Sequence, residues 1–186
     1  MAVESRDPYT AGHQKRVSAL AGAIAREMGY PPEDCEAIRM AGAIHDLGKI
    51  SIPAEILSMP RRLLDLEYNL IKTHADKGYQ ILKDIEFGRP IAEIVHQHHE
   101  RLDGSGYPRG LKGPAIPIEA RIANLADQYD ALRNARGHKP AHDHSTVCRI
   151  LNQGDGRTLP QHFDPQVLKA FREADFLFAN IYKEII

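Results

Sequence analysis

The chain has 186 residues, 42% of them hydrophobic, so one domain can bury a core without a disulfide bond between its two cysteines. Its 24 basic and 25 acidic side chains give a formal net charge of −1, which argues against a broad basic surface that binds a nucleic-acid polymer. No apolar run approaches about 18 residues and no hydrophobic signal region opens the chain, so we expect a soluble, cytoplasmic protein that does not enter a membrane. The anomaly of the composition is its ten histidines.

Apolar residues recur every three or four positions along most of the chain, which indicates helices, whereas the alternation typical of strands is nearly absent. In chain order, the predicted helices cover residues 10–28, 33–47, 65–83, 91–100, 117–132 and 145–151, followed by a helical pair from Asp164-Pro165 to the end. The inward positions of the third helix are predicted to be Leu70, Ile71, His74 and Ile81. We therefore expect a single all-α domain, a helical bundle of about seven to eight helices.

One stretch interrupts the helical pattern. Residues 102–117 contain four glycines and three prolines, which predicts a long loop, and long loops inside compact domains are usually functional. Within it, Tyr107 and Arg109 stand among glycines, where an aromatic ring can stack on a base and a guanidinium can hold a phosphate. An ordinary surface turn would explain the glycines and prolines equally well.

Several histidines and aspartates fall on inward faces of the predicted helices. The full set is His13, His45, Asp46, His74, His98, His99 and Asp127. Of these, His45 and Asp46 lie ~100° apart around their helix and can address one ion from neighbouring directions. A single buried histidine is more commonly a hydrogen-bonded core residue than a ligand, but burying this many polar groups together is costly unless a metal compensates. Because so many ligands exceed the needs of one tetrahedral ion, we predict a binuclear site for Fe, Mn or Zn.

The other histidines lie in polar surroundings and are predicted to be solvated; they are His96, His138, His142, His144 and His162. Lys49 follows the His45-Asp46 pair closely, where its ammonium can neutralise a phosphate. A cation that stabilises the carboxyl end of a helix is an equally good explanation of Lys49 alone.

These residues spell a known pattern. The doublet His45-Asp46, followed by Leu47-Gly48-Lys49, resembles the HD superfamily of metal-dependent phosphohydrolases. The run HHERLDGSGYP at 98–108 resembles the signature of its HD-GYP subfamily, supported by DPYTAGH at 7–13, IKTH at 71–74 and ADQYDAL at 126–132. The resemblance covers about residues 5–175. It implies one HD-GYP catalytic domain over residues 1–186, with a C-terminal helix to 186, that hydrolyses the bacterial second messenger cyclic di-GMP.

The resemblance also implies residue roles. The metal ligands would be His45, Asp46, His74, His98, His99 and Asp127, with Asp46 bridging two divalent ions, Fe or Mn. The resemblance assigns substrate binding to Lys49, Tyr107, Arg136 and Lys139. From the composition of the glycine-rich loop we add Asp103, Gly106 and Arg109 to this substrate-binding set. Asp46 and Lys49 would be catalytic, since a metal-bound hydroxide attacks phosphorus in line while Lys49 offsets negative charge. The products would be linear pGpG and, after a second cut, GMP.

Two positions depart from the family pattern. Tyr9 stands where some relatives carry an acidic residue that helps to hold a third metal, so we expect two ions. His13 and Asp130 are then residues that either support the ligands or hold an optional third metal. The stretch Arg136-Gly137-His138-Lys139 keeps both cations of the family's arginine-proline-tyrosine-arginine but loses the proline and tyrosine.

Two alternatives remain open: a cyclic di-GMP-binding signalling domain with little turnover, and a phosphodiesterase for another cyclic dinucleotide. Related proteins usually carry a receiver or sensor domain before this module, so we expect such a partner domain, diguanylate-cyclase-type signalling partners and an origin in a longer protein. The apolar residues near the end predict either a homodimer contact or a core-packing helix; they are Phe171, Phe176, Phe178 and Ile181.

Overall fold

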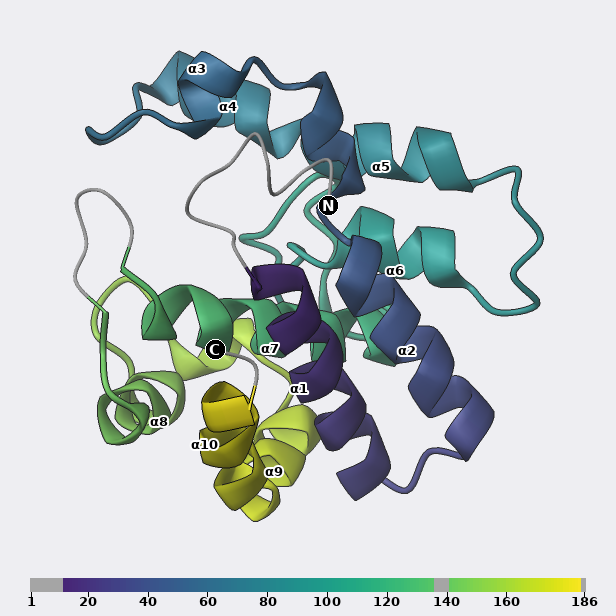
Figure 1. Ribbon diagram of the computed structural model, residues 1–186, viewed down its shortest axis with the longest axis vertical. Coiled ribbons are helices and arrows are strands. Elements are labelled where there is room, and N and C mark those ends of the chain that lie inside the picture. The colour runs from purple at the N-terminus through teal and green to yellow at the C-terminus, as the bar shows by residue number, and fades with distance from the viewer. Residues whose placement is uncertain (1–11, 136–140, 185–186) are drawn as a thin grey trace.

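The computed structural model describes residues 12–135 and 141–184, and these ranges contain helices but no β-strand (Figure 1). The α-helices are α1 (His13–Glu27), α2 (Pro32–Ile44), α3 (Ala54–Leu57), α4 (Asp65–Lys72), α5 (His74–Leu82), α6 (Ile91–Gln97), α7 (Ile118–Arg133), α8 (His144–Gln153), α9 (Pro165–Glu173) and α10 (Asp175–Glu184). Three 3-10 helices lie between them: η1 (Leu47–Ser51), η2 (Gly113–Ala115) and η3 (Pro160–His162). The predicted all-α bundle is confirmed.

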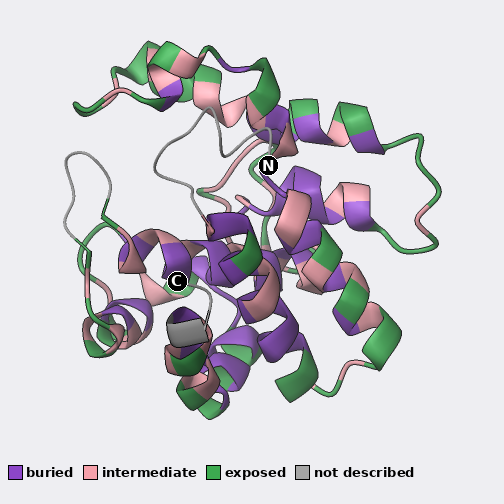
Figure 2. Ribbon diagram, viewed as in Figure 1, coloured by how far each residue is buried: buried purple, intermediate pink, exposed green. Residues whose placement is uncertain are grey.

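The core is built around α1 and α7, which pack against each other near the centre of the molecule. Figure 2 shows most of the buried residues there. Val17, Leu20 and Ile24 of α1 are fully buried, as the spacing of the apolar residues predicts. They belong to one cluster with Leu125 and Tyr129 of α7. Full burial of each such aliphatic side chain contributes about 1.5–3 kcal/mol, so these two helices form the stable support on which the other segments rest.

The second helix ends at Ile44, three positions earlier than predicted. His45 and Asp46 therefore lie in the turn between α2 and η1 rather than side by side on a helix. The reason is a close backbone contact: a Cβ atom at Gly48 would lie only 1.9 Å from the carbonyl oxygen of His74. The chain leaves the helix to bring η1 against α5, and only glycine permits that approach.

The predicted third helix is divided at Thr73 into α4 and α5. The Thr73 hydroxyl donates to the carbonyl of Leu70 at 2.7 Å, where the chain changes direction. The prediction of one continuous inward face is therefore wrong: His74 is buried, but Leu70 and Ile81 are 39% and 44% exposed. Helix α4 extends from the body of the molecule together with α3 and has no buried residue (Figure 1).

The C-terminal helices α9 and α10 pack against α1. Phe171 and Phe178 are fully buried in the main cluster, which confirms the core-packing explanation for these two residues, whereas Phe176 is 63% exposed. Among the described residues, no helix has the length and apolarity needed to cross a bilayer.

Candidate metal centre and its pocket

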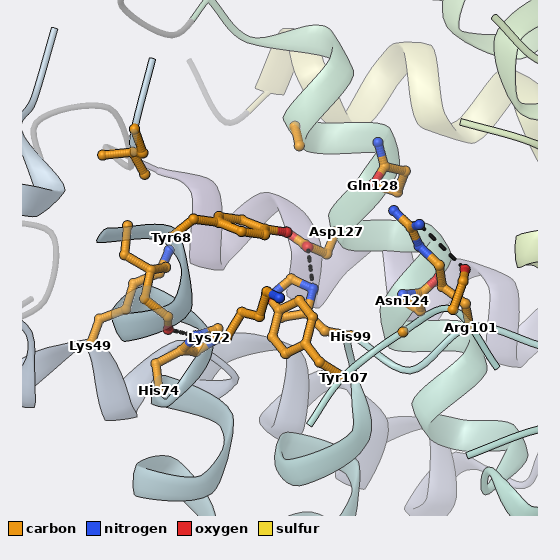
Figure 3. Close-up of a pocket in the computed structure, with 15 residues that line it drawn as sticks. Lys49, Tyr68, Lys72, His74, His99, Arg101, Tyr107, Asn124, Asp127 and Gln128 are labelled. Atoms are coloured by element: carbon orange, nitrogen blue, oxygen red, sulfur yellow. Dashed lines mark hydrogen bonds and ion pairs between the residues drawn. The ribbon is translucent and has the colours of Figure 1, made fainter. Parts of the chain in front are cut away.

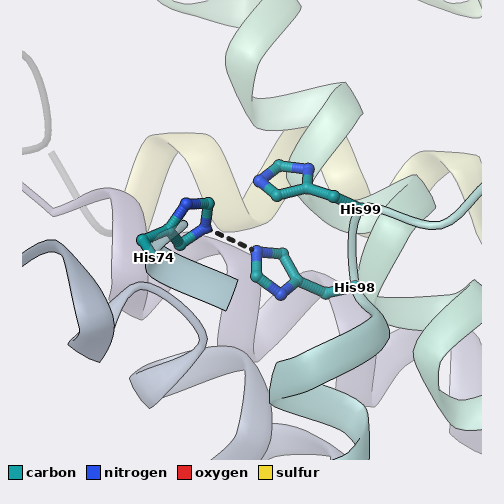
Figure 4. Close-up of side chains that lie close together, drawn as sticks. All are labelled: His74, His98 and His99. Carbon is teal, nitrogen blue, oxygen red and sulfur yellow. Dashed lines mark hydrogen bonds between the residues drawn. The ribbon is translucent and has the colours of Figure 1, made fainter. Parts of the chain in front are cut away.

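The predicted ligands come together although they belong to separate parts of the chain. His13 begins α1, His45 and Asp46 follow α2, and His74 begins α5. The pair His98-His99 follows α6, which ends at Gln97, three positions before the predicted end. Figure 4 shows His74, His98 and His99 pointing toward one another. Asp127 faces this group from α7, so helix ends supply most of the donors and one long helix closes the cluster.

Three of these histidines are oriented in the same way. The Nδ1 atom of His45 lies 2.7 Å from the carbonyl oxygen of Gly42, and that of His74 lies 2.7 Å from the carbonyl of Ile71. The Nδ1 atom of His98 lies 2.6 Å from the carbonyl of Val95. A carbonyl can only accept, so each Nδ1 carries the proton and each Nε2 directs a lone pair into the cluster. Metal-binding histidines are typically held in this way.

The Nε2 atoms face one another in two pairs. His13 Nε2 lies 3.2 Å from His45 Nε2, and His74 Nε2 lies 3.3 Å from His98 Nε2. Two lone pairs at this distance repel unless a cation or proton lies between them. Nitrogens that bind one ion at about 2.1 Å lie roughly 3.0–3.4 Å apart for angles between octahedral and tetrahedral. The spacing of both pairs therefore fits two metal positions.

Asp46 lies between the two pairs. Its Oδ1 atom is 3.5 Å from His74 Nε2, and its Oδ2 atom is 3.4 Å from His45 Nε2. Each oxygen of one carboxylate thus faces a different pair, so Asp46 would be placed to bridge if each pair held an ion. Asp127 adds a second carboxylate, with Oδ1 3.3 Å from His13 Nε2 and Oδ2 3.8 Å from His99 Nδ1.

The protonation states suit metal binding. Burial lowers the pKa of His74 and His98, and it lowers the pKa of His99 to about 3, so these rings stay neutral. Burial opposes ionisation of Asp46, but Lys49 and the neighbouring histidines outweigh it and hold the pKa of that carboxyl well below its usual range. Neutral imidazoles and ionised carboxylates are the forms that bind metals.

His13 has a different support. Its Nδ1 atom lies 2.7 Å from Asp130 Oδ2, and Asp130 also accepts hydrogen bonds from Arg16 at 2.7 Å and from Asn134 at 3.1 Å. Burial lowers the pKa of His13, but Asp127 and Asp130 outweigh it and raise that pKa to about 9. Without a metal, His13 is therefore protonated near neutral pH and its Nε2–H faces the cluster, while Asp130 lies behind it and fixes the ring. A metal bound at Nε2 would displace that proton.

A pocket of about 400 Å³ opens over this cluster (Figure 3). Among the predicted substrate-binding residues, Lys49, Gly106 and Tyr107 line it. Lys49 Nζ also lies 2.8 Å from Asp46 Oδ2. Burial raises the pKa of Tyr107 well above its ordinary value, so the phenol is neutral and can donate a hydrogen bond. Several polar lining residues were not predicted; they are Tyr68, Lys72, Arg101, Ser105, Asn124 and Gln128.

The glycine-rich loop is fixed by hydrogen bonds to the side chain of Glu100. This buried carboxylate accepts hydrogen bonds from the backbone N–H of Arg109 at 2.7 Å and of Leu111 at 2.9 Å. The Arg109 side chain is exposed and does not line the pocket, and Asp103 instead accepts from the Ser105 backbone and hydroxyl. Arg101 takes the place at the pocket that was predicted for Arg109. Arg136 and Lys139 lie outside the described residues.

Two of the histidines predicted to be solvated are buried. His96 Nε2 lies 2.8 Å from Asp76 Oδ1 and the ring stacks on Tyr79, while His162 packs beneath the loop, 3.8 Å from Asp103. Their partners are distant in sequence, so the neighbouring residues could not reveal these contacts. His142 and His144 are partly exposed, and His138 lies outside the described residues.

The comparison with protein families agrees with this geometry. A family model described as HD domain matches residues 1–167, so the chain belongs to the HD domain family. The chain is 42% identical over 171 residues to the cyclic di-GMP phosphodiesterase response regulator RpfG of Xanthomonas campestris, covering 91% of this chain and 44% of that protein. It is 33% identical over 183 residues to 3'3'-cGAMP-specific phosphodiesterase 3 of Vibrio cholerae, covering 98% of this chain and 39% of that protein. The resemblance to the HD-GYP group is confirmed, and the chain spans less than half the length of these relatives.

Solved structures show the same fold. An HDG"Y"P protein from Bdellovibrio bacteriovorus superposes with a TM-score of 0.70 at 21% identity, over 87% of this chain and 50% of that one. The HD domain of the Listeria monocytogenes phosphodiesterase PgpH, in complex with cyclic-di-AMP, gives a TM-score of 0.67 at 20% identity, over 96% of this chain and 93% of that one. These likenesses establish the HD-type arrangement of helices.

Proposed function

We propose that this domain is a metal-dependent phosphodiesterase that hydrolyses cyclic di-GMP to linear pGpG, and to GMP after a second cut. The observation that carries the proposal is the position of Asp46, whose two oxygens face two separate histidine pairs at the base of a pocket lined by cations. Relatives of 42% and 38% identity bear the name cyclic di-GMP phosphodiesterase, which supports the substrate class.

The ligand set we propose comprises His45, Asp46, His74, His98, His99 and Asp127, with His13 as a further donor beside His45. Two divalent ions, Fe or Mn, would activate a water molecule and neutralise phosphate charge when bound there. Nitrogen and carboxylate donors without sulfur suit both metals. Lys49 keeps Asp46 ionised and oriented through its 2.8 Å contact.

The chain's own residues would position the dinucleotide. Lys72 and Arg101 place positive charge on the pocket wall, where they meet the phosphates. The Tyr107 ring lies beside His99, with ring centres 4.6 Å apart, and lines the pocket, where its hydroxyl can donate a hydrogen bond to the dinucleotide. Asn124 donates to the His98 carbonyl at 2.8 Å, which fixes the turn that carries two of the proposed ligands.

The decisive test is product analysis with purified protein loaded anaerobically with Fe²⁺ or with Mn²⁺. We expect cyclic di-GMP to be converted to pGpG and then GMP, as followed by chromatography. Tight binding of intact cyclic di-GMP without product would instead identify a receptor with little turnover. Absence of both binding and product under reducing conditions would overturn the proposal.

A second substrate is favoured by one specific observation. Three relatives named 3'3'-cGAMP-specific phosphodiesterases are 33%, 36% and 34% identical to this chain, close to the values for cyclic di-GMP relatives. Side-by-side measurement of kcat/KM for cyclic di-GMP and for 3'3'-cGAMP decides between the two substrates. We expect the value for cyclic di-GMP to be the higher one. Because one relative is named a response regulator, we also propose a receiver-type domain as the regulatory partner of this domain.

A further inference from the structure

A second group of metal-binding side chains lies away from the pocket. Helix α8 carries His144 and Cys148 four positions apart, on the same face, and Asp175 is the first residue of α10. The two helices lie at the same end of the molecule, beside α7 (Figure 1). One donor atom from each of the three residues lies within 4.8 Å of the others, and none of the three belongs to the proposed catalytic set.

The distances from His144 Nε2 to its two partners suit a tetrahedral ion. His144 Nε2 lies 3.6 Å from Cys148 Sγ and 3.5 Å from Asp175 Oδ1. On a zinc ion, with nitrogen at about 2.1 Å and sulfur at about 2.3 Å, the two donors lie roughly 3.6 Å apart, and nitrogen and oxygen lie roughly 3.4 Å apart. His144 Nε2 therefore has the spacing from both partners that a shared ion requires, and all three donors lie within 4.8 Å of one another. Cys148 Sγ also lies 3.8 Å from His144 Nδ1, so it stands beside the ring, and a rotation of the Cys148 side chain would bring the sulfur to an ion held by Nε2.

Tyr129 orients the histidine of this group. Its hydroxyl oxygen lies 2.8 Å from His144 Nδ1, and the tyrosine side chain is fully buried in the core. When His144 donates its Nδ1–H to this oxygen, Nε2 keeps the lone pair with which the ring can bind an ion. A fixed hydrogen-bond partner on the far nitrogen is typical of histidines that bind metals.

We propose that His144, Cys148 and Asp175 bind one divalent zinc-type ion, with solvent at the fourth position. Thiolate, imidazole and carboxylate are the donor classes of zinc, and the sulfur distinguishes this site from the nitrogen and oxygen donors of the catalytic centre. Burial raises the pKa of the Cys148 thiol to about 11, so binding displaces the thiol proton into solvent as the sulfur–metal bond forms. The ion ties α8 to α10. The proposal does not depend on the phosphodiesterase activity.

Cobalt(II) titration of the whole chain tests the site, because a thiolate bound to Co²⁺ gives an intense near-ultraviolet charge-transfer absorption that histidine and carboxylate ligands do not give. We expect the absorbance of this band to stop rising once one Co²⁺ per chain is bound to the thiolate, and the band to disappear on addition of Zn²⁺. Cys148→Ser should abolish it. Cys35→Ser is the matched control, because Cys35 is buried in α2 and its thiol contacts the carbonyl of Tyr30, so this variant should leave the band unchanged. Absence of the band in the unmodified chain, or its survival in folded Cys148→Ser, would overturn the proposal.

Two further variants test the other members of the site. Asp175→Asn should weaken Co²⁺ binding at the thiolate site by at least about tenfold, whereas Asp84→Asn, an exposed aspartate elsewhere, should not change it. Tyr129→Phe should weaken it by about 10–100-fold while the circular dichroism of the helices is retained. Unchanged affinity in Asp175→Asn would contradict the three-donor site, and unchanged affinity in folded Tyr129→Phe would contradict the positioning role of Tyr129.

Discussion

His13 and Asp130 are 117 positions apart in the chain, yet His13 Nδ1 lies 2.7 Å from Asp130 Oδ2. This contact leaves the other ring nitrogen facing His45 and Asp127. It explains how the first residue of α1 can join a cluster whose other members come from the middle of the chain. It also makes Asp130 a positioning residue for one of the two metal positions that we propose.

Asp130→Asn should therefore weaken metal binding at the position shared by His13 and His45 by about 10–100-fold, because the amide no longer holds the ring through a charge-assisted hydrogen bond. Isothermal titration with Mn²⁺ measures this effect as the loss of one high-affinity ion. Asp84→Asn, which is exposed, provides the control. Full retention of both ions in Asp130→Asn would show that Asp130 has no part in metal binding.

Asp46→Ala should abolish loading with two ions, since its carboxylate is the group placed between the two histidine pairs. Elemental analysis of the purified variant measures the metal content directly, and we expect fewer than two ions per chain together with loss of hydrolysis. Two ions retained per chain would refute the assignment of Asp46 as the bridge.

Lys72→Met should weaken substrate binding rather than folding. Lys72 Nζ lies 4.8 Å from the centre of the Tyr68 ring and 5.8 Å from that of Tyr107, at the wall of the pocket. Loss of one charged contact to a phosphate should raise KM for the dinucleotide about tenfold or more with little change in kcat. Steady-state kinetics at two salt concentrations measures this change, and Lys77→Met, on the exposed side of α5, is the matched control. Equal KM values in the two variants would exclude Lys72 from substrate binding.

Gly106→Ala should damage the loop. A Cβ atom at Gly106 would lie 2.4 Å from the backbone nitrogen of Arg101 and 2.5 Å from the carbonyl oxygen of His99, and backbone atoms cannot move aside cheaply. We expect the free energy of unfolding to fall by about 1–3 kcal/mol, with a loss of activity. Urea denaturation measures the stability. Gly88→Ala introduces a side chain into open space, but at a φ of 68° that strains alanine, so it carries only the backbone cost and should leave activity intact. An equal loss of activity in both variants would argue against the close packing of the loop.

The stability of the metal-free protein should depend on pH with opposite slopes on the two sides of about pH 6.5. Burial lowers the pKa of His74, His98 and His99 from the ordinary value of 6.5. Below pH 6.5 the unfolded chain therefore binds protons that the folded chain does not, and the free energy of unfolding decreases as the pH is lowered. His13 acts in the opposite sense: its pKa of about 9 gives a contribution that is complete below 6.5 and is lost as pH rises toward 9.

Urea denaturation in the presence of a chelator, repeated across this range, measures both limbs. The variant His13→Gln should flatten the decline between pH 6.5 and 9 and leave the acidic limb in place. An unchanged alkaline limb in that variant would show that His13 is not the group responsible.

The sequence predicts the helices well wherever one apolar face packs continuously, as it does in α1 and α7. It fails where a backbone contact decides the course of the chain, as at Gly48, because periodicity carries no information about a carbonyl from a later segment. The clustering of these side chains was predictable because histidine and aspartate on apolar faces are costly without a compensating partner. The pocket wall was not, because Tyr68 and Arg101 reach it from segments whose direction is set by tertiary packing.

The same limit explains the errors among the histidines. His96 was expected to be solvated, but its partner Asp76 lies 20 positions earlier, on α5. Only the pairing of α5 with α6 brings the two together. His144 was expected to be an ordinary surface residue, yet it meets Tyr129, Cys148 and Asp175, three residues from three different helices.

The close approach of Gly48 to the His74 carbonyl has a consequence for how such a domain can diverge. The distance between the segment that carries Asp46 and the segment that carries His74 is set by main chain against main chain, not by the side chains that we propose as ligands. Substitution of those side chains during evolution would therefore leave the backbone spacing of the two segments unchanged. In such a domain the fold can be conserved while the chemistry of the site changes.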